Sequence, residues 1–288
     1  MVIRPEVDDP AGWEAPGQIT LPNAFIASQK SETAEFSPAW EPVARRQGLL
    51  AASYWLIRQP DHAALSGELA ARFRAPGFAL PNSDAIAAIA GHDSGWAAFP
   101  FEASLQVDPP TGSDGRPMSF LDFGPDFFLP AWTLSIDRAE QASRVGGRMV
   151  SGHFYRLGQG RLAAQVDEGG NRRRLQEFLQ AEQRRQHRLE ACIPISAEQA
   201  DALVDVLQFC DVLSLYLCCG AQEAVEFPQQ LGGRRIRLRF CHGAFKLDPS
   251  PFKGEGSQDS SAIRLSVPAS RYPHPKGPEI RQLNFELC

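Results

Sequence analysis

The sequence predicts a mainly α-helical fold with a small antiparallel β annex at the C-terminal end. Apolar residues recur at helical spacing through most of residues 48–230. After Gly232 the pattern changes to alternation, and "RRIRLRF", "IRLSV" and "QLNFEL" have the period of half-buried strands. We therefore expect an irregular lead-in over residues 1–47, a helical domain over residues 48–230, and a β annex over residues 231–288 that packs on the helical domain.

Helix start and stop residues predict the first two helices. The stretch "HAALSGELAARF" follows Pro60, which suits the first turn of a helix, and Pro76 ends it. A second, strongly apolar helix starts at Asn82 or Ser83, since either is a good N-cap residue. This helix is expected to stop around Gly95.

The later helices follow a long connection over residues 101–130. Asp137 and Glu140 form a capping-box-like start for the helix "RAEQASRVGGRMVSGHFYRL". Two more helices are expected, a charged one over residues 172–190 and a far more apolar one over residues 197–218. The charged helix mixes glutamates with its arginines, so we interpret it as a solvated face.

Composition excludes several classes of function. The chain has 288 residues, 43% of them hydrophobic and 22% charged, which is ordinary for a soluble globular protein. Its net charge of −5 argues against general nucleic-acid binding. No apolar run approaches the roughly 18 residues of a membrane span, and the acidic N-terminus does not look like a secretory signal. The six unevenly spaced cysteines suggest reduced thiols, so a cytoplasmic protein without membrane contact is expected.

Several polar residues fall on apolar helix faces. His62, His92, His153 and Asp211 each have mainly apolar neighbours at helical spacing. A lone buried histidine more often donates to a backbone carbonyl than binds a metal, and a lone buried aspartate more often caps a turn or pairs with an arginine. These alternatives weaken when several such groups occur on separate helices of one domain. A single metal cation would satisfy them together.

The order His62, His92–Asp93 and Asp211 resembles the H…HD…D signature of the HD superfamily of metal-dependent phosphohydrolases. The stretches "QPDHAALSGELA", "AIAGHDSGW", "GRPMSFLDF", "SGHF" and "DVLSLYLC" together look like the family of domain of unknown function 3891. This resemblance runs from about residue 48 to the C-terminus. It implies an HD-domain-like helical bundle.

The resemblance also implies a metal site. Its ligands would be His62, His92, Asp93 and Asp211, and Asp93 would be the bridge if two ions bind. His153 fits a position at which relatives with two metals add a histidine, so it is both a further ligand candidate and a catalytic candidate. The second added histidine is not evident; Asp122 and Asp61 are the candidates to replace it, and a site with one ion is the other interpretation. The ligand set suits Mn, Fe, Co, Ni or Zn.

Metal-activated water acting on a small phosphorylated or nucleotide substrate is the reaction that the resemblance implies. Asp93 would be central to it, and Arg116 in "DGRPMSF" is the candidate cationic clamp for the phosphate. An ion pair between Arg116 and an acid of the same loop is an equally good interpretation. Two other functions stay open: a di-iron oxygenase of the HD type, and a non-catalytic metal-binding helical module whose β annex binds a partner. The sequence does not indicate an oligomeric state.

Overall fold

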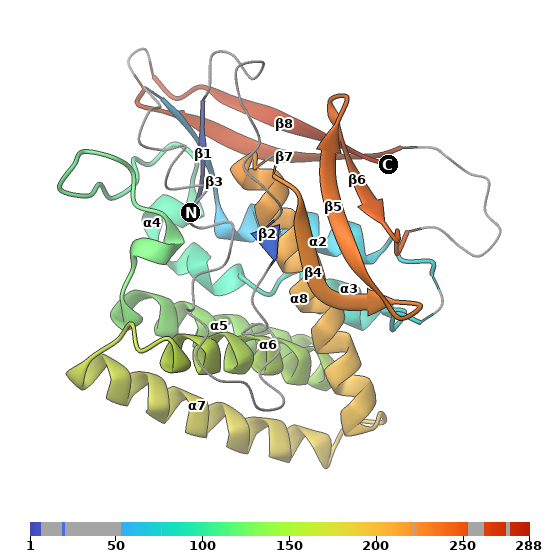
Figure 1. The fold of residues 1–288 in the computed structure, drawn as a ribbon. Helices are drawn as coiled ribbons and strands as arrows, with labels where there is room; N and C mark the ends of the chain where they lie inside the picture. Colours follow the sequence, from blue (N-terminus) through green and yellow to red (C-terminus); the bar gives the residue numbers. More distant parts are fainter. Residues whose placement is uncertain (7–18, 21–52, 76, 222, 253–261, 275–276) are drawn as a thin grey trace.

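The computed structural model describes residues 1–6, 19–20, 53–75, 77–221, 223–252, 262–274 and 277–288. These residues form an α+β fold in which a large curled sheet lies on one side of a set of helices (Figure 1). The prediction of a mainly α, HD-like bundle with a small antiparallel β annex, and with it the description all-alpha, is therefore wrong. The greater part of the predicted lead-in, residues 7–18 and 21–47, lies outside the described residues.

Eight strands of the described chain form one mixed sheet in the order β1-β3-β7-β8-β6-β5-β4-β2. The pairs β2–β4 and β6–β8 are parallel and the others are antiparallel. Figure 1 shows β7 and β8 running nearly across the direction of β5, which gives the sheet its curl. The strands are β1 (Val2–Pro5), β2 (Ile19–Thr20), β3 (Tyr54–Ile57), β4 (Val225–Leu231), β5 (Arg234–Cys241), β6 (Ala244–Asp248), β7 (Ile263–Tyr272) and β8 (Ile280–Leu287).

Strand β3 explains why the sheet is larger than expected. It lies between β1 and β7, and its four residues, Tyr54–Ile57, are all buried. A short strand that is buried on both faces has no alternation, and its sequence cannot be told from a helical segment. The three strands predicted from alternation are confirmed, because each has one exposed face. On β5, for example, Ile236 and Leu238 are buried and the neighbouring arginines are exposed.

The helices lie in two groups beneath the sheet (Figure 1). α2 and α8 contact the sheet directly, α3 packs on α2 and α8, and α5, α6 and α7 lie farther from the sheet. The segments are α2 (Gln59–Ala70), α3 (Ser83–Ala90), α4 (Pro100–Ala103), α5 (Pro125–Ala142), α6 (Arg144–Ala163), α7 (Gly169–Glu190) and α8 (Ala197–Cys219), with short 3-10 turns η3 (Ser94–Ala98) and η4 (Phe120–Asp122).

The predicted helix start at Asp137 is wrong. Helix α5 runs through this position, and the chain breaks instead at Ser143, whose side chain accepts from Gly146 N–H at the start of α6. Asp137 and Glu140 do not cap a helix because both carboxylates pair with Arg185 of α7. The acids therefore join two helices that the sequence placed far apart.

Helix α8 forms the centre of the fold. In the described residues it is the one helix long and apolar enough to cross a membrane, but 83% of its apolar window is buried inside the protein. Such burial is typical of the core helix of a soluble domain. A capping box of Ser196 and Gln199 starts α8, and Gly220 in the left-handed conformation ends it. Location in the cytoplasm stays a prediction.

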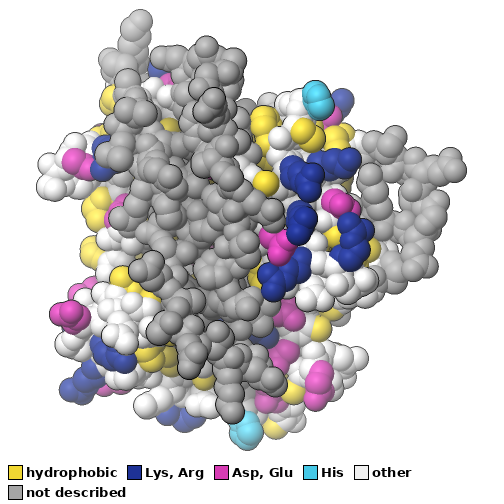
Figure 2. Space-filling model, in the orientation of Figure 1, with side chains coloured by type: hydrophobic (Ala, Val, Ile, Leu, Met, Phe, Trp, Pro, Cys, Tyr) yellow, Lys and Arg dark blue, Asp and Glu magenta, His cyan; other side chains and the backbone are white. Residues whose placement is uncertain are grey.

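The outer face of β5 carries alternate arginines, and basic side chains gather over this part of the molecule in Figure 2. Arg235 and Arg237 both pair with Glu226 of the adjacent strand β4, which neutralises part of this charge. Strand β4 itself crosses residue 230, the predicted boundary between the helical domain and the annex. The division of the chain at that boundary stays a prediction.

Candidate metal centre

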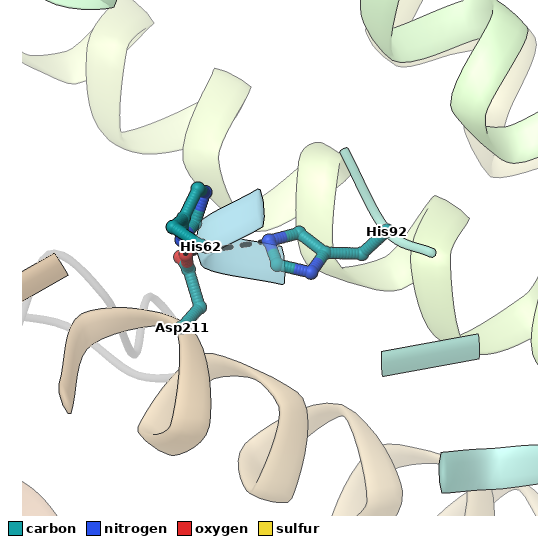
Figure 3. A group of neighbouring side chains, drawn as sticks. All are labelled: His62, His92 and Asp211. Carbon is teal, nitrogen blue, oxygen red and sulfur yellow. Dashed lines mark ion pairs between the residues drawn. The ribbon is translucent and has the colours of Figure 1, made fainter. Parts of the chain in front are cut away.

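The structure brings together the four residues that the sequence singles out as ligands. His62 comes from α2, Asp211 from the middle of α8, and His92 and Asp93 from the turn that follows α3. One ligand atom each of His62, His92 and Asp211 lies within 4.8 Å of the other two (Figure 3). These three buried residues could hold a metal ion.

The turn after α3 positions His92 and Asp93. Helix α3 begins at its N-cap Asn82, as predicted, but ends at Ala90, before the His–Asp pair. The pair lies in the turn that leads into η3, where Asp93 is the N-cap residue. Close packing fixes this turn on one side, since a Cβ on Gly95 would lie 2.0 Å from the Ala131 carbonyl oxygen of α5.

His92 directs one nitrogen outward and the other into the centre. Its Nδ1 atom lies 2.8 Å from the backbone carbonyl oxygen of Ile89, which can only accept, so Nδ1 carries the hydrogen. Nε2 then faces the centre, 3.3 Å from Asp211 Oδ1 and 3.7 Å from Asp93 Oδ2. This nitrogen is buried, and it is oriented toward the centre as the nitrogen of a metal-binding histidine usually is.

His62 is arranged in a similar way. Its Nε2 atom lies 2.8 Å from Asp93 Oδ2, and its Nδ1 atom lies 3.0 Å from the hydroxyl of Ser214. Asp211 Oδ1 is 3.8 Å from the same Nδ1 atom. The two histidine rings meet edge to face with centroids 5.3 Å apart. Both imidazoles therefore present Nε2 to a carboxylate and have an outer partner at Nδ1.

The shifted pKa values of His92 and Asp211 indicate that a positive charge stabilises the centre. Burial alone would lower the pKa of His92, but the carboxylates of Asp93 and Asp211 and the Ile89 carbonyl raise it to about 9. Burial alone would raise the pKa of Asp211, but the hydrogen bond from His92 and the charges of His92, His153 and His62 bring it to about 2. Two carboxyl groups that share a buried site are stabilised by a cation between them, and either a proton or a metal ion can serve.

His153 of α6 borders the same group. Its Nε2 atom lies 3.7 Å from Oδ2 of Asp211, and its ring meets the His92 ring edge to face at 5.3 Å. Burial lowers the pKa of His153 to about 4 against the opposing charge of Asp211, so the ring is neutral. The two oxygens of Asp211 thus face two different histidines, and His153 Nδ1 is buried without a hydrogen-bond partner among the described residues.

Arg116 lies on the loop before α5 and pairs with Asp114 of the same loop, through both Nε and Nη2. This ion pair is the alternative that the sequence left open, and its two side chains are 38% and 48% exposed. Asp61 forms a bidentate ion pair with Arg58, whose Nε and Nη2 atoms donate to the two carboxylate oxygens at 2.6 and 2.7 Å. The Asp122 side chain accepts from Ser119 N–H in a capping box. The structure therefore gives these three residues partners outside the histidine–aspartate group.

Two serines of the centre are not predicted from the sequence. Ser66 and Ser214 are fully buried and lie 2.8 Å apart between α2 and α8. Ser66 follows His62 by four residues and Ser214 follows Asp211 by three, so both lie on the same helix faces as the ligand candidates. That spacing could have identified them.

Fold and site together define a class of protein: an α+β protein in which two histidines and two aspartates, on three packed helical segments, form a buried group suited to a metal ion. Residues 49–264 match a family model, and the chain belongs to this family, which is described as protein of unknown function (DUF3891). Comparison with curated proteins finds no match, and neither does comparison with solved structures.

Proposed function

We propose that this protein is a metal-dependent phosphohydrolase that acts on a small phosphorylated or nucleotide substrate. The observation that carries the proposal is the pair of imidazole Nε2 atoms, from His62 and His92, directed at the carboxylates of Asp93 and Asp211. The resemblance of these four residues to the H…HD…D signature of the HD superfamily supports the same function.

The donor set suits a divalent transition metal. Neutral imidazoles and carboxylates together bind Mn, Fe, Co, Ni and Zn, and four donors leave coordination positions for water and a phosphate oxygen. Such an ion supplies hydroxide near neutral pH, because it lowers the pKa of bound water from about 15.7 to about 7. His153 faces Asp211 Oδ2 and would extend the site toward a second ion.

Access to the centre favours a small substrate. The side chains of His62, His92 and His153 are at most 1% exposed, whereas Asp93 is 10% and Asp211 is 7% exposed. Water and a substrate oxygen would therefore reach the centre along its carboxylate edge. In this arrangement the two histidines and the two aspartates would hold the ion, and the more exposed aspartates would also border the reacting group.

The test is metal analysis combined with a phosphatase assay on purified protein. The protein would be reconstituted with Mn²⁺, Co²⁺, Ni²⁺ or Zn²⁺ and assayed with phosphomonoesters, phosphodiesters and nucleotides. Asp93→Ala is expected to lose bound metal and to reduce turnover by several orders of magnitude, with the helical circular dichroism retained. The matched control is Asp167→Asn, another buried aspartate, which pairs with Arg161 on α6 and should keep metal and activity.

Other outcomes separate the alternatives. A protein that binds no metal and hydrolyses no phosphoester after reconstitution contradicts the proposal. Metal binding without hydrolysis of any of these substrates would favour a non-catalytic metal-binding module. Two bound irons with visible absorption that changes on reaction with oxygen would favour a di-iron oxygenase.

A further inference from the structure

Two buried hydroxyls adjoin His62 and have no role in the proposed chemistry. Ser214 Oγ lies 3.0 Å from His62 Nδ1, 2.9 Å from the Asp211 carbonyl oxygen and 2.8 Å from Ser66 Oγ. Ser66 Oγ also lies 3.1 Å from the His62 carbonyl oxygen and 3.3 Å from that of Cys210. Both serines are completely buried. Protein groups therefore surround each hydroxyl.

With the Ser66 hydrogen directed at Ser214, its nearest partner, counting hydrogens leaves two arrangements of the remaining contacts. Each hydroxyl has one hydrogen to donate and can accept two. In the first arrangement, His62 Nδ1–H donates to Ser214, whose own hydrogen goes to the Asp211 carbonyl. In the second, the Ser214 hydrogen points to His62 Nδ1, and His62 Nε2–H donates to Asp93 at 2.8 Å. Ser66 donates to Ser214 in both arrangements.

His92 has no such choice. Its Nδ1 atom faces the Ile89 carbonyl oxygen, which accepts but never donates. The neutral His92 ring is therefore fixed with its hydrogen on Nδ1 and its lone pair on Nε2. The outer partner of His62, a hydroxyl, is therefore compatible with either neutral tautomer, whereas the outer partner of His92, a carbonyl, is compatible with only one.

We propose that Ser214, supported by Ser66, lets His62 exchange between two tautomers as the metal binds. Without metal, His62 keeps its hydrogen on Nε2 and donates it to Asp93, which holds that carboxylate in place. With metal, the hydrogen lies on Nδ1, the Ser214 hydroxyl turns toward the Asp211 carbonyl, and Nε2 offers its lone pair to the ion. One hydrogen leaves Nε2 for water and one is taken up from water at Nδ1, so the exchange itself changes no charge. This inference rests on the metal centre of the proposed function.

The variant that tests the role of the hydroxyl is Ser214→Ala. With metal bound, Nδ1–H of His62 would then be buried without an acceptor, so binding is disfavoured. Removing an outer partner of a metal-binding histidine usually weakens metal affinity about 10- to 100-fold, and we expect a loss of this size for Zn²⁺, measured by competition with a chromogenic chelator. Ser214→Thr keeps a hydroxyl and should recover most of the affinity. The matched control is Ser270→Ala, since Ser270 is a buried serine on β7.

The tautomers are measured directly on the wild-type protein, which keeps the proposal testable if a variant fails to fold. Nitrogen chemical shifts of the histidine side chains distinguish Nδ1–H from Nε2–H. We expect His62 to change from Nε2–H to Nδ1–H on adding Zn²⁺, and His92 to keep its Nδ1–H in both states. An unchanged His62 tautomer, or Zn²⁺ affinity in Ser214→Ala within threefold of wild type, overturns this inference and leaves the proposed function standing. Absence of Zn²⁺ binding to the wild type overturns both.

Discussion

His92 Nε2 lies 3.3 Å from Oδ1 of Asp211, and both side chains are buried. The Ile89 carbonyl holds the His92 hydrogen on Nδ1, so the neutral ring would direct a lone pair at a carboxylate oxygen. Two electron-rich atoms at this distance repel each other unless a cation lies between them. The carboxylates raise the pKa of His92, so a proton on its Nε2 is one cation that removes this repulsion. A divalent metal ion would remove it with two positive charges.

Metal should stabilise the fold, because the ligands come from segments that unfolding separates. A ligand present at 1,000 times its Kd adds about 4 kcal/mol to the free energy of unfolding. For a chain of this size that corresponds to a rise in Tm of roughly 10 °C. Thermal unfolding with and without saturating Zn²⁺ measures it. Asp211→Asn, which removes a central ligand charge, should abolish the shift, and an equal shift in that variant would place the bound ion elsewhere.

The position of His153 beside Asp211 leads us to predict a second metal ion. Asp211 presents Oδ1 to His92 and Oδ2 to His153, so one carboxylate could serve two neighbouring ions. We expect two Mn²⁺ ions per chain in the wild type and one in His153→Gln, by calorimetric titration and elemental analysis. The control His187→Gln changes an exposed histidine of α7 and should keep both ions. A single ion in wild type and in His153→Gln would restrict the site to four ligands.

The residues of the centre could be identified from the sequence because each helix shows its polar residue against an apolar background. His62 and Asp211 stand on faces whose other members are buried and apolar, and helical spacing makes such exceptions visible. The His–Asp pair follows an equally apolar helix, α3. The helical spacing does not predict which group hydrogen-bonds to Nδ1 of each histidine ring. The Ile89 carbonyl is a backbone atom, and its position depends on where α3 ends.

The sheet was harder to predict because it is assembled from distant parts of the chain. Strand β3 pairs with β7, so Tyr54 lies opposite Tyr272, more than two hundred residues later. Local patterns carry no information on such pairing, and β3 itself lacks alternation because all four of its residues are buried. Strand β5 could be predicted because its arginines face solvent. The sequence therefore predicts too small a sheet, because burial on both faces removes the alternation that identifies a strand.

Substitution of Arg116 tests substrate binding separately from metal binding. Its pair with Asp114 is exposed, so losing it should change the free energy of unfolding very little. If Arg116 clamps a phosphate, Arg116→Ala should raise KM about tenfold and leave metal content unchanged. The control Asp114→Ala removes the loop partner and keeps the guanidinium, so it should not raise KM. An unchanged KM in Arg116→Ala would leave the residue with its loop ion pair alone.

Gly95 should be essential to the fold next to the metal centre. A Cβ at this position would lie 2.0 Å from the Ala131 carbonyl oxygen and 2.7 Å from Ser135 N, both backbone atoms of α5. Backbone cannot turn aside as a side chain can, so Gly95→Ala must push η3 away from α5. Such overpacking costs about 3 kcal/mol or more of unfolding free energy, measured by urea denaturation.

Gly124→Ala is the matched control for this effect. Gly124 is the N-cap of α5, its φ of −79° suits any residue, and within the described residues no atom lies within 4 Å of its added Cβ. The free energy of unfolding should therefore change by less than about 1 kcal/mol. Gly95→Ala should also weaken Zn²⁺ binding, because displacing η3 moves Asp93, its N-cap residue. Full stability in Gly95→Ala would mean that η3 and α5 do not approach as closely as 2.0 Å implies, and the position of the His92–Asp93 turn would then have to be set by α3 alone.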